Sequence, residues 1–326
     1  MYHSFASPAQ LLDKLFELYN SSCSTKTTTP SASGNSKNSA AGSNPSPTPL
    51  SNNSSSANST NPAKNAPTPA NTSQSPASPS LCPTTDPPRL IDLSARDIAQ
   101  QLTLDIWPIY CSIKPTELFN GAWIKPSAPS TAPNVTKLIQ RFNFVSTWAS
   151  SAICSELNEE LRRKTFTKIV HVATYLKALR NYHLLYAVLS GISNMAIIRL
   201  KKTIGKIDRQ TMQTLSTLEL LMDMRGSYKY YRTALKKIKN TSCIPSITIL
   251  LKDLIFIEDG NPDVINGLIN WSKRRQAFQQ IAEFLAYTTA PLKGVVSLVV
   301  NDVPASTIIE KTVLLDEDQL YALSVS

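Results

Sequence analysis

Apolar positions recur at helical spacing along much of the chain after residue 160, with polar residues between them. Spacings of three and four residues place side chains on one face of a helix, so each stripe predicts an amphipathic helix. Alternating strand patterns, and hairpin turns such as Asn-Gly between apolar runs, are largely missing, and the chain has only nine glycines. The pattern predicts an all-α fold. The four clearest stripes are Ile169, Val172, Ala173, Leu176 and Leu179; Leu184, Leu185, Val188, Leu189 and Ile192; Leu215, Leu218, Leu221 and Met222; and Phe278, Ile281, Ala282 and Leu285.

The same pattern divides the chain into three parts. Residues 21–88 are almost entirely Ser, Thr, Pro, Asn and Ala, a composition that buries too little apolar surface to offset the entropy of ordering it. We expect a disordered linker there. Residues 1–20 carry leucines at helical spacing after Ser7 and Pro8, which predicts one helix that must dock elsewhere, because a helix this short is marginal alone. Residues 89–326 are expected to form one helical domain.

One segment of that domain predicts a helical hairpin. Ile247, Leu250, Leu251 and Leu254 form the apolar stripe of a first helix. Gly260 suits the left-handed position that ends a helix, and the Asn and Pro that follow suit a cap and the start of the returning chain. A second helix is expected from about residue 270 to 285. The segment as a whole predicts a helical hairpin with an acidic tip.

Charge and cysteine content narrow the function only slightly. The 33 Lys and Arg against 23 Asp and Glu give a formal net charge of +10, which suits nucleic acid, anionic lipid or an acidic protein surface. The five cysteines lie far apart and never as C-x-x-C, and the three histidines lie near no clustered ligands, so we expect neither a disulfide framework nor a bound metal. No secretory signal or spanning segment is visible, which predicts a cytoplasmic protein.

Catalytic motifs are also missing from the sequence. Gly205 and Lys206 lack the upstream glycine and the following hydroxyl residue of a phosphate-binding loop, so any nucleotide is expected on a partner. No serine, histidine or cysteine has the spacing of a nucleophile with its base, which disfavours covalent enzyme chemistry. The basic clusters around residues 162, 201, 236 and 273 are typical of solvated helix faces. A basic nucleic-acid-binding protein stays open as a weaker alternative.

Several segments, taken in order, resemble the catalytic domain of Ras guanine-nucleotide exchange factors. The resemblance covers nearly all of residues 89–292. Residues 2–19 are similar to the closing helix of the exchanger motif that precedes this domain in the family. The matching segments are A-Q-Q-L-T at 99–103, residues 113–118 with Trp123, Trp148, L-R-N-Y at 179–182, R-L-K-K-T at 199–203, Y-K-Y-Y-R at 228–232, residues 243–245, residues 251–262 and N-W-S-K-R-R at 270–275.

The resemblance implies a function and a mechanism. The chain would bind a Ras-type small GTPase in its nucleotide-free state and promote release of GDP, with no cofactor, because magnesium and nucleotide belong to the partner. The helical hairpin would act as a wedge. Ile255 stands where the family has an apolar residue near the magnesium position, Asp259 where it has a carboxylate near the phosphates, and Asn261 follows them at the tip. From the residue pattern alone, the better interpretation is that Ile255 is ordinary core and Asp259 an ordinary helix-end acid. The resemblance reverses that order.

The resemblance also implies residues that contact the GTPase. Lys168, Ser193 and Tyr228 align with contact positions, and Ser246 stands at a position that is often aromatic. Trp148 and Asn181 match the family too, but they could equally hold the scaffold. Ile198 stands at a position that is often Tyr or Phe in the family, and Lys168 at one that is commonly Arg. These departures, with that at Ser246, keep a second hypothesis open, a non-catalytic scaffold of the same fold that binds a GTPase. The net charge is compatible with recruitment to the inner face of a membrane.

Overall fold

The structure is a computed structural model that describes residues 90–238, 241–292, 295, 299–300 and 303–325. The predicted helix in residues 1–20 and the predicted linker of residues 21–88 lie outside these described residues. The elements, in chain order, are η2 Leu90–Asp92, α2 Ala95–Cys111, η3 Pro115–Leu118, α3 Ala128–Thr131, α4 Pro133–Cys154, α5 Glu159–Ala178, α6 Tyr182–Ile192, α7 Met195–Arg199, α8 Lys201–Gly205, α9 Arg209–Leu221, α10 Lys229–Lys236, α11 Ile247–Gly260, β1 Val264–Ile265, β2 Leu268–Ile269, α12 Trp271–Leu285, η4 Ala286–Thr289, β3 Val299–Val300, β4 Val303–Pro304, α13 Ala305–Glu310 and α14 Glu317–Val325.

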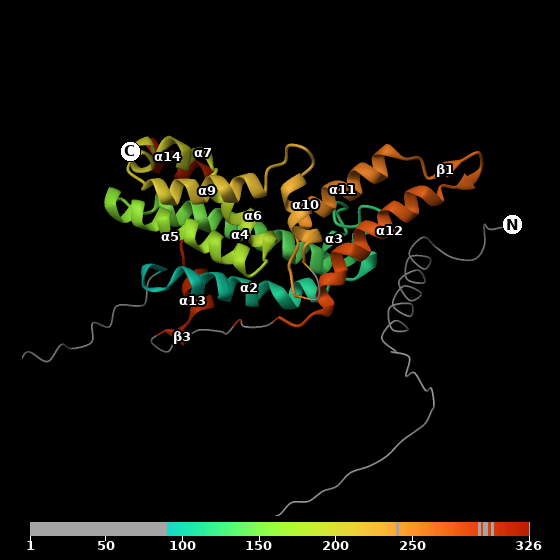
Figure 1. Cartoon of the computed structure of the whole chain (residues 1–326), viewed down its shortest axis with the longest axis horizontal. Coiled ribbons are helices and arrows are strands. Elements are labelled where there is room, and N and C mark those ends of the chain that lie inside the picture. The colour runs from blue at the N-terminus through green and yellow to red at the C-terminus, as the bar shows by residue number, and fades with distance from the viewer. Residues whose placement is uncertain (1–89, 239–240, 293–294, 296–298, 301–302, 326) are drawn as a thin grey trace, which may run out of the picture. The chain divides into compact units, whose positions relative to one another are not determined.

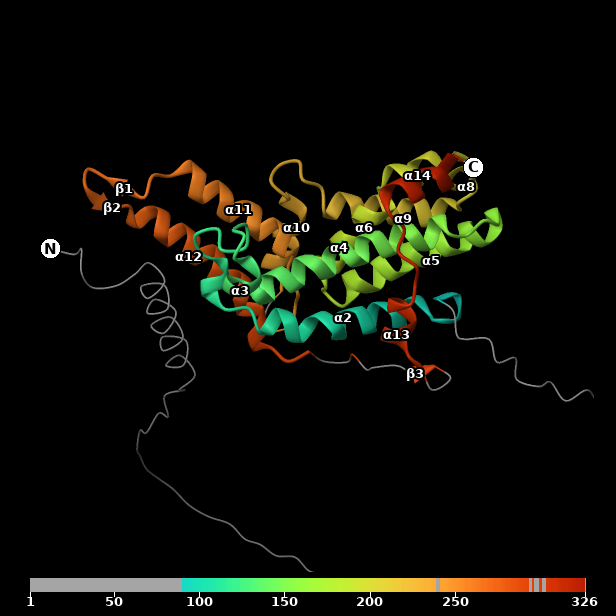
Figure 2. The ribbon, with the colours of Figure 1, turned by 180° about the vertical axis from the view of Figure 1, so that it is seen from behind.

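The predicted all-α fold is confirmed in the described part of the chain. The predicted stripes lie on α5, α6, α9 and α12 (Figure 1). Helices α2, α4, α5 and α6 pack on one another and form the centre of the buried core, and the same grouping is seen from behind (Figure 2). At the closest approach, Gly191 of α6 lies against Ser146 of α4, where a Cβ atom would meet the Ser146 carbonyl oxygen at 2.3 Å. This glycine is therefore needed for packing.

The predicted helical hairpin is also present. Helices α11 and α12 lie side by side and antiparallel, and the chain turns between them through β1 and β2 (Figure 1). One Asn-Gly hairpin turn, which the sequence analysis did not identify, joins β1 to β2. Asn266 and Gly267 both have positive φ, at 51° and 75°, and join the two strands as a two-residue turn. Asn-Gly favours this left-handed turn because both residues tolerate positive φ.

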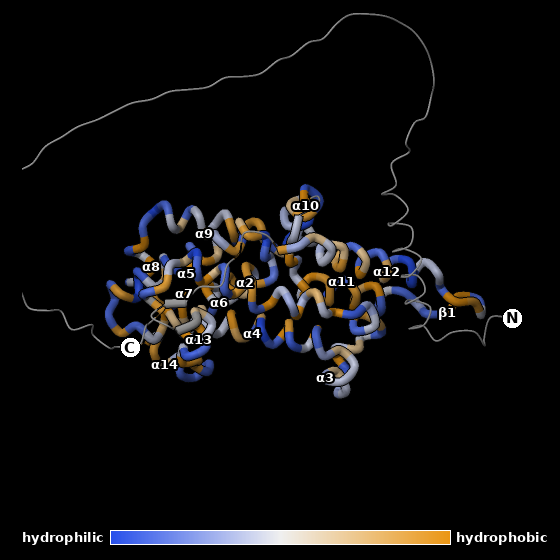
Figure 3. The backbone as a smooth tube through the Cα atoms, turned by 90° about the horizontal axis from the view of Figure 1, so that it is seen from below, coloured by the Kyte–Doolittle hydropathy of each residue, from blue (hydrophilic) through white to orange (hydrophobic). Residues whose placement is uncertain are grey.

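The tip of the hairpin is apolar as well as acidic. Val264, Ile265, Leu268 and Ile269 are all exposed, Leu268 most of all at 73%. Hydropathy colouring shows this apolar end beyond the polar turns of α12 (Figure 3). Trp271, the first residue of α12, is exposed beside it. Large exposed apolar groups at one place mark an interaction surface.

The end of α11 differs from the expectation. Gly260 is the last helical residue and is not among the residues with positive φ, and the cap residue Asn261 is extended at φ −136°. The predicted left-handed glycine cap is therefore wrong. Asn261 caps the helix with its side chain instead, because its Nδ2 donates to the carbonyl oxygen of Ile257 at 3.0 Å. A side-chain donor satisfies a helix-end carbonyl as well as a backbone amide does.

No helix in the described part of the chain is both long enough and apolar enough to cross a membrane.

Candidate functional site

The residues expected at the hairpin lie together on the last turns of α11. Helix α11 buries Ile247, Leu250, Leu251 and Leu254, as the stripe predicts. Ile255 is half-buried rather than largely exposed, and Asp259 is exposed. The structure therefore presents a carboxylate at the end of α11, with an apolar side chain one turn before it.

A strained turn lies beside α11, just before α10. Ser227 and Tyr228 both have positive φ, at 56° and 58°. Non-glycine residues adopt this conformation rarely, and it persists only where surrounding contacts hold it. Arg232 supplies such contacts, because its Nε donates to the Ser227 carbonyl oxygen at 2.8 Å and its Nη2 lies 2.7 Å from an Asp253 carboxylate oxygen. Arg232 thus ties this turn to α11.

The turn places Tyr228 between the body and the hairpin. Its hydroxyl lies 3.3 Å from that of Tyr186 on α6, and the two rings meet edge to face. The Lys252 ammonium lies 5.5 Å from the Tyr228 ring centroid and 5.6 Å from that of Phe256. An ammonium is attracted to the face of an aromatic ring at this range. Burial raises the pKa of Tyr228, so its hydroxyl stays neutral.

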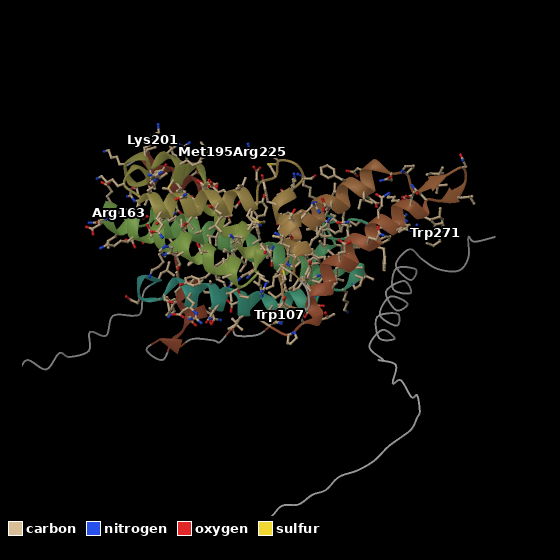
Figure 4. All side chains as sticks on the ribbon, viewed as in Figure 1. Trp107, Arg163, Met195, Lys201, Arg225 and Trp271 are labelled. Atoms are coloured by element: carbon tan, nitrogen blue, oxygen red, sulfur yellow. The ribbon has the colours of Figure 1, made fainter. Side chains whose placement is uncertain are left out.

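We call the set of Tyr186, Ser193, Tyr228, Lys252 and Phe256 the Tyr228 face. At its centre Tyr228, only 6% exposed, meets Tyr186 on one side and Lys252 on the other, and Lys252 also lies near Phe256. Ser193 is exposed at the end of α6 and lines an open hollow of about 630 Å³ together with Tyr186. Phe256 is 63% exposed on α11. These residues come from the end of α6, the turn before α10 and α11. Figure 4 marks Arg225, which also lines the hollow, in the loop before α10, and Trp271 toward the tip.

Sequence reasoning missed Lys252 and Phe256. Phe256 falls out of phase with the buried stripe of α11, which ends at Leu254, and it stands three residues before Asp259. A large aromatic side chain off the apolar stripe and next to an acidic helix end is a signal that could have found it.

Two expected contact residues, Trp148 and Asn181, are fully buried. Asn181 caps α6, since its Oδ1 accepts from the Leu184 amide at 3.0 Å, and its Nδ2 donates to Thr103 Oγ1 at 3.0 Å. Trp148 lies in the core between helices, and its Nε1 has no hydrogen-bond partner. In this structure both residues hold the scaffold and do not reach the surface.

The remaining two expected contacts lie apart from the Tyr228 face. Ser246 is buried at the start of α11, where its amide donates to the Tyr231 hydroxyl at 2.9 Å. Lys168 lies on α5, and its Nζ donates to the carbonyl oxygen of Leu93 at 2.7 Å. Burial lowers the pKa of Lys168. Of the six expected contact residues, Ser193 and Tyr228 belong to the Tyr228 face, where Tyr186 links them.

The described residues contain no group of three or more His, Cys, Asp or Glu side chains placed to hold a metal ion. Their buried histidine, His183, faces the Leu138 carbonyl oxygen at 3.2 Å and belongs to the core.

Comparison with known proteins identifies the family. A sequence profile of the RasGEF domain matches residues 97–275, which run from the first turn of α2 to the start of α12. The chain is 38% identical over 242 residues to Ras guanine nucleotide exchange factor K of Dictyostelium discoideum, covering 74% of this chain and 15% of that protein. It is 40% identical over 191 residues to factor R of the same organism, covering 59% of this chain and 11% of that protein.

A third relative, Ras guanine nucleotide exchange factor A of Dictyostelium discoideum, is 34% identical over 224 residues, covering 65% of this chain and 37% of that protein. The chain thus spans well under half the length of each of these relatives. The match nevertheless covers the whole Tyr228 face and the first helix of the hairpin. With that match over more than half of its residues, the chain belongs to the RasGEF domain family.

Proposed function

We propose that the chain is a guanyl-nucleotide exchange factor that binds a Ras-type small GTPase and promotes release of GDP. The observation that carries this proposal is the RasGEF domain match over residues 97–275, together with relatives that bear the name Ras guanine nucleotide exchange factor. In this function the chain forms no covalent intermediate and binds no nucleotide itself. It lowers the barrier to release by stabilising the GTPase without its nucleotide.

The proposed mechanism uses the hairpin of α11 and α12 as a wedge at the nucleotide site of the GTPase. The exposed Asp259 carboxylate would oppose the charge of the phosphates, since two like unit charges about 4 Å apart repel by about 4 kcal/mol at an effective dielectric near 20. Ile255, half-buried one turn earlier, would take up space near the magnesium ion and offers no ligand atom. Asn261 supports both by capping the helix.

The Tyr228 face would hold the GTPase while the hairpin acts. It includes two tyrosines, Tyr186 and Tyr228, and tyrosine is one of the residue types that concentrate binding energy at protein interfaces. The exposed Phe256 and the Lys252 ammonium extend it onto α11. It is continuous with α11, so one partner could contact the face and the hairpin together. Ser193 and Tyr228 keep their proposed contact roles on this surface.

Linkage makes the effect reciprocal. If binding of the chain weakens the affinity of the GTPase for GDP, then GDP must weaken the binding of the chain by the same factor. The complex should therefore be most stable without nucleotide and dissociate when GDP or GTP is added. The net charge of +10 is the basis for proposing that the chain is recruited to the inner, anionic face of a membrane.

The test is release of a fluorescent GDP analogue from purified Ras-type GTPases in the presence of excess unlabelled GDP. Substoichiometric amounts of the chain should accelerate release from at least one of them and leave a small GTPase of another type unaffected. A stable complex without faster release would identify a non-catalytic GTPase-binding scaffold. Binding to nucleic acid with no GTPase binding would favour the basic nucleic-acid-binding alternative.

A further inference from the structure

A buried lysine on α12 holds the end of α11. The Lys273 side chain is 3% exposed. Its Nζ lies 3.1 Å from Glu258 Oε1, 3.0 Å from the Glu258 carbonyl oxygen and 2.9 Å from Asp263 Oδ1. A lysine ammonium has three N–H donors and no acceptor, so these three oxygens satisfy it completely.

The contacts of Lys273 fall where α11 has unsatisfied groups. The last four carbonyls of a helix lack partners within the helix. Asn261 Nδ2 donates a hydrogen bond to the Ile257 carbonyl oxygen at 3.0 Å, and Lys273 Nζ donates to the next carbonyl oxygen, that of Glu258. Two side chains thus replace the glycine cap that the sequence suggested. Because Lys273 belongs to α12, its bonds also tie the two helices of the hairpin together.

The same cluster joins the tip to the body of the domain. The hydrogen bond from Lys273 is the largest cause that lowers the pKa of Asp263. Asp263 also accepts from Arg274 Nη2 at 2.6 Å, and the Arg274 guanidinium lies 5.4 Å from the ring centroid of Phe119, which follows η3. Lys273 and Arg274 therefore share the Asp263 carboxylate. Lys273 also binds Glu258 on α11, and Arg274 also contacts Phe119 in the body of the domain.

We propose that Lys273 is a positioning residue for nucleotide release, because its buried ammonium fixes the last turn of α11 and so sets the direction in which Asp259 projects. The inference rests on the proposed function. Asp259 directly follows Glu258, whose carboxylate and carbonyl both bind Lys273. Since Asp259 is exposed, the backbone of that turn decides where its carboxylate lies. Lys273 acts through this backbone and needs no contact with the GTPase.

The test combines Lys273→Met with Asp259→Asn in a double-mutant cycle, using release of a fluorescent GDP analogue at saturating and at limiting concentrations of the chain. Lys273→Met keeps an unbranched side chain and removes the ammonium. It should lower the maximal release rate several-fold with little change in the concentration that gives half of it. Asp259→Asn should then add little further loss in the Lys273→Met background, because the carboxylate is no longer directed.

Two variants keep the outcome decisive. Arg275→Met removes a cation from an exposed position on the same helix and should leave the rate unchanged. Asp263→Asn keeps an acceptor oxygen but removes the negative charge that pairs with Lys273. It is milder, so it should lower the rate in the same way if Lys273→Met fails to fold. Thermal melting of every variant excludes partial unfolding.

The outcomes separate the inference from the function on which it rests. If Asp259→Asn slows release, but Lys273→Met and Asp263→Asn do not, the positioning role is wrong and the wedge stands. If the losses from Lys273→Met and Asp259→Asn multiply fully, the two residues act independently and the positioning role is also wrong. If the unaltered chain releases no GDP from any Ras-type GTPase, the proposed function itself fails.

Discussion

The backbone of Asn181 forms a parallel β-bridge with that of Ile244. The Ile244 amide donates to the Arg180 carbonyl at 3.0 Å, and its carbonyl accepts from the Tyr182 amide at 2.9 Å. The residues just before α11 are therefore bound to the junction between α5 and α6. This relationship gives the hairpin a fixed root in the body of the domain, and it explains why Asn181 is buried rather than exposed to a partner.

Replacing Asn181 by Ala should be strongly destabilising. It removes the cap of α6 and leaves the buried Leu184 amide and Thr103 hydroxyl short of a partner, at a cost of about 2 kcal/mol or more. Asn158→Ala is the matched control, because Asn158 caps α5 in the same way at an exposed position and should cost about 1 kcal/mol. Urea unfolding of both variants measures this, and equal losses would contradict the anchoring role of Asn181.

Replacing Gly191 by Ala should separate α4 from α6. The added Cβ would lie 2.3 Å from the Ser146 carbonyl oxygen and 2.9 Å from the Ala149 Cβ, and overpacking of this kind costs about 1–3 kcal/mol or more. The control is Gly205→Ala, since a Cβ there meets nothing within 4 Å. Alanine is the better helix former by up to about 1 kcal/mol, so the control should melt at the same temperature or higher. A neutral Gly191→Ala would refute the close packing.

The stability of the domain should fall in mild acid because of His183. Burial lowers its pKa to about 4 from the ordinary 6.5. The unfolded chain therefore takes up this proton at higher pH than the folded chain does. The stability that neutral, buried His183 contributes is fully present above about pH 6.5. It is lost as the pH falls toward 4, at up to about 1.4 kcal/mol of unfolding free energy per pH unit.

This slope is measured by urea unfolding across that pH range. His183→Gln keeps a donor toward the Leu138 carbonyl and cannot titrate, so its stability should fall less steeply with acid. Parallel curves for the two proteins would show that other groups cause the acid loss.

Tyr228 should have separable roles in packing and in binding. The residue is 6% exposed and belongs to the core, so Tyr228→Ala should cost about 3–5 kcal/mol, as for other large aromatic residues cut to Ala. Tyr228→Phe keeps the ring and removes the hydroxyl near Tyr186. It should melt near the original temperature but weaken complex formation with the nucleotide-free GTPase. Full binding by Tyr228→Phe would assign the residue to packing alone.

The fold was largely predictable because helical periodicity is a local property. The stripes around residues 169–179 and 278–285 predicted α5 and α12, and the second hairpin helix was expected within a residue of its observed start. The short β1–β2 ribbon was missed, since two residues a strand give no alternation to detect. The glycine cap was wrong because Asn261 and Lys273 cap α11 with side chains, and Lys273 comes from the opposite helix.

The candidate site was predictable only in part. Asp259 was expected at the hairpin from its neighbours in sequence, and it is exposed there. Burial of Asn181 depends on Thr103, which lies 78 residues earlier, and the place of Tyr228 depends on Tyr186, 42 residues earlier. Residue type and local spacing cannot predict partners so far away in the sequence. The sequence therefore identified the hairpin but could not separate scaffold residues from surface residues.

The central claim is that the end of α11 drives release of nucleotide, and Asp259→Asn tests it most directly. The substitution keeps the shape of the exposed side chain and removes the charge that would oppose phosphate. Ile255→Ala should be measured alongside it. Because Ile255 is half-buried, cutting it to Ala should cost less stability than the roughly 2–5 kcal/mol that a fully buried isoleucine costs.

The decisive measurement is the rate of GDP release from a responsive Ras-type GTPase at a saturating concentration of each variant, with thermal melting alongside. We predict that Asp259→Asn releases GDP several-fold more slowly than the unaltered chain and melts at the same temperature. Release at the original rate by Asp259→Asn, together with loss of the fold in Ile255→Ala, would show that the hairpin is scaffold and contradict the wedge mechanism.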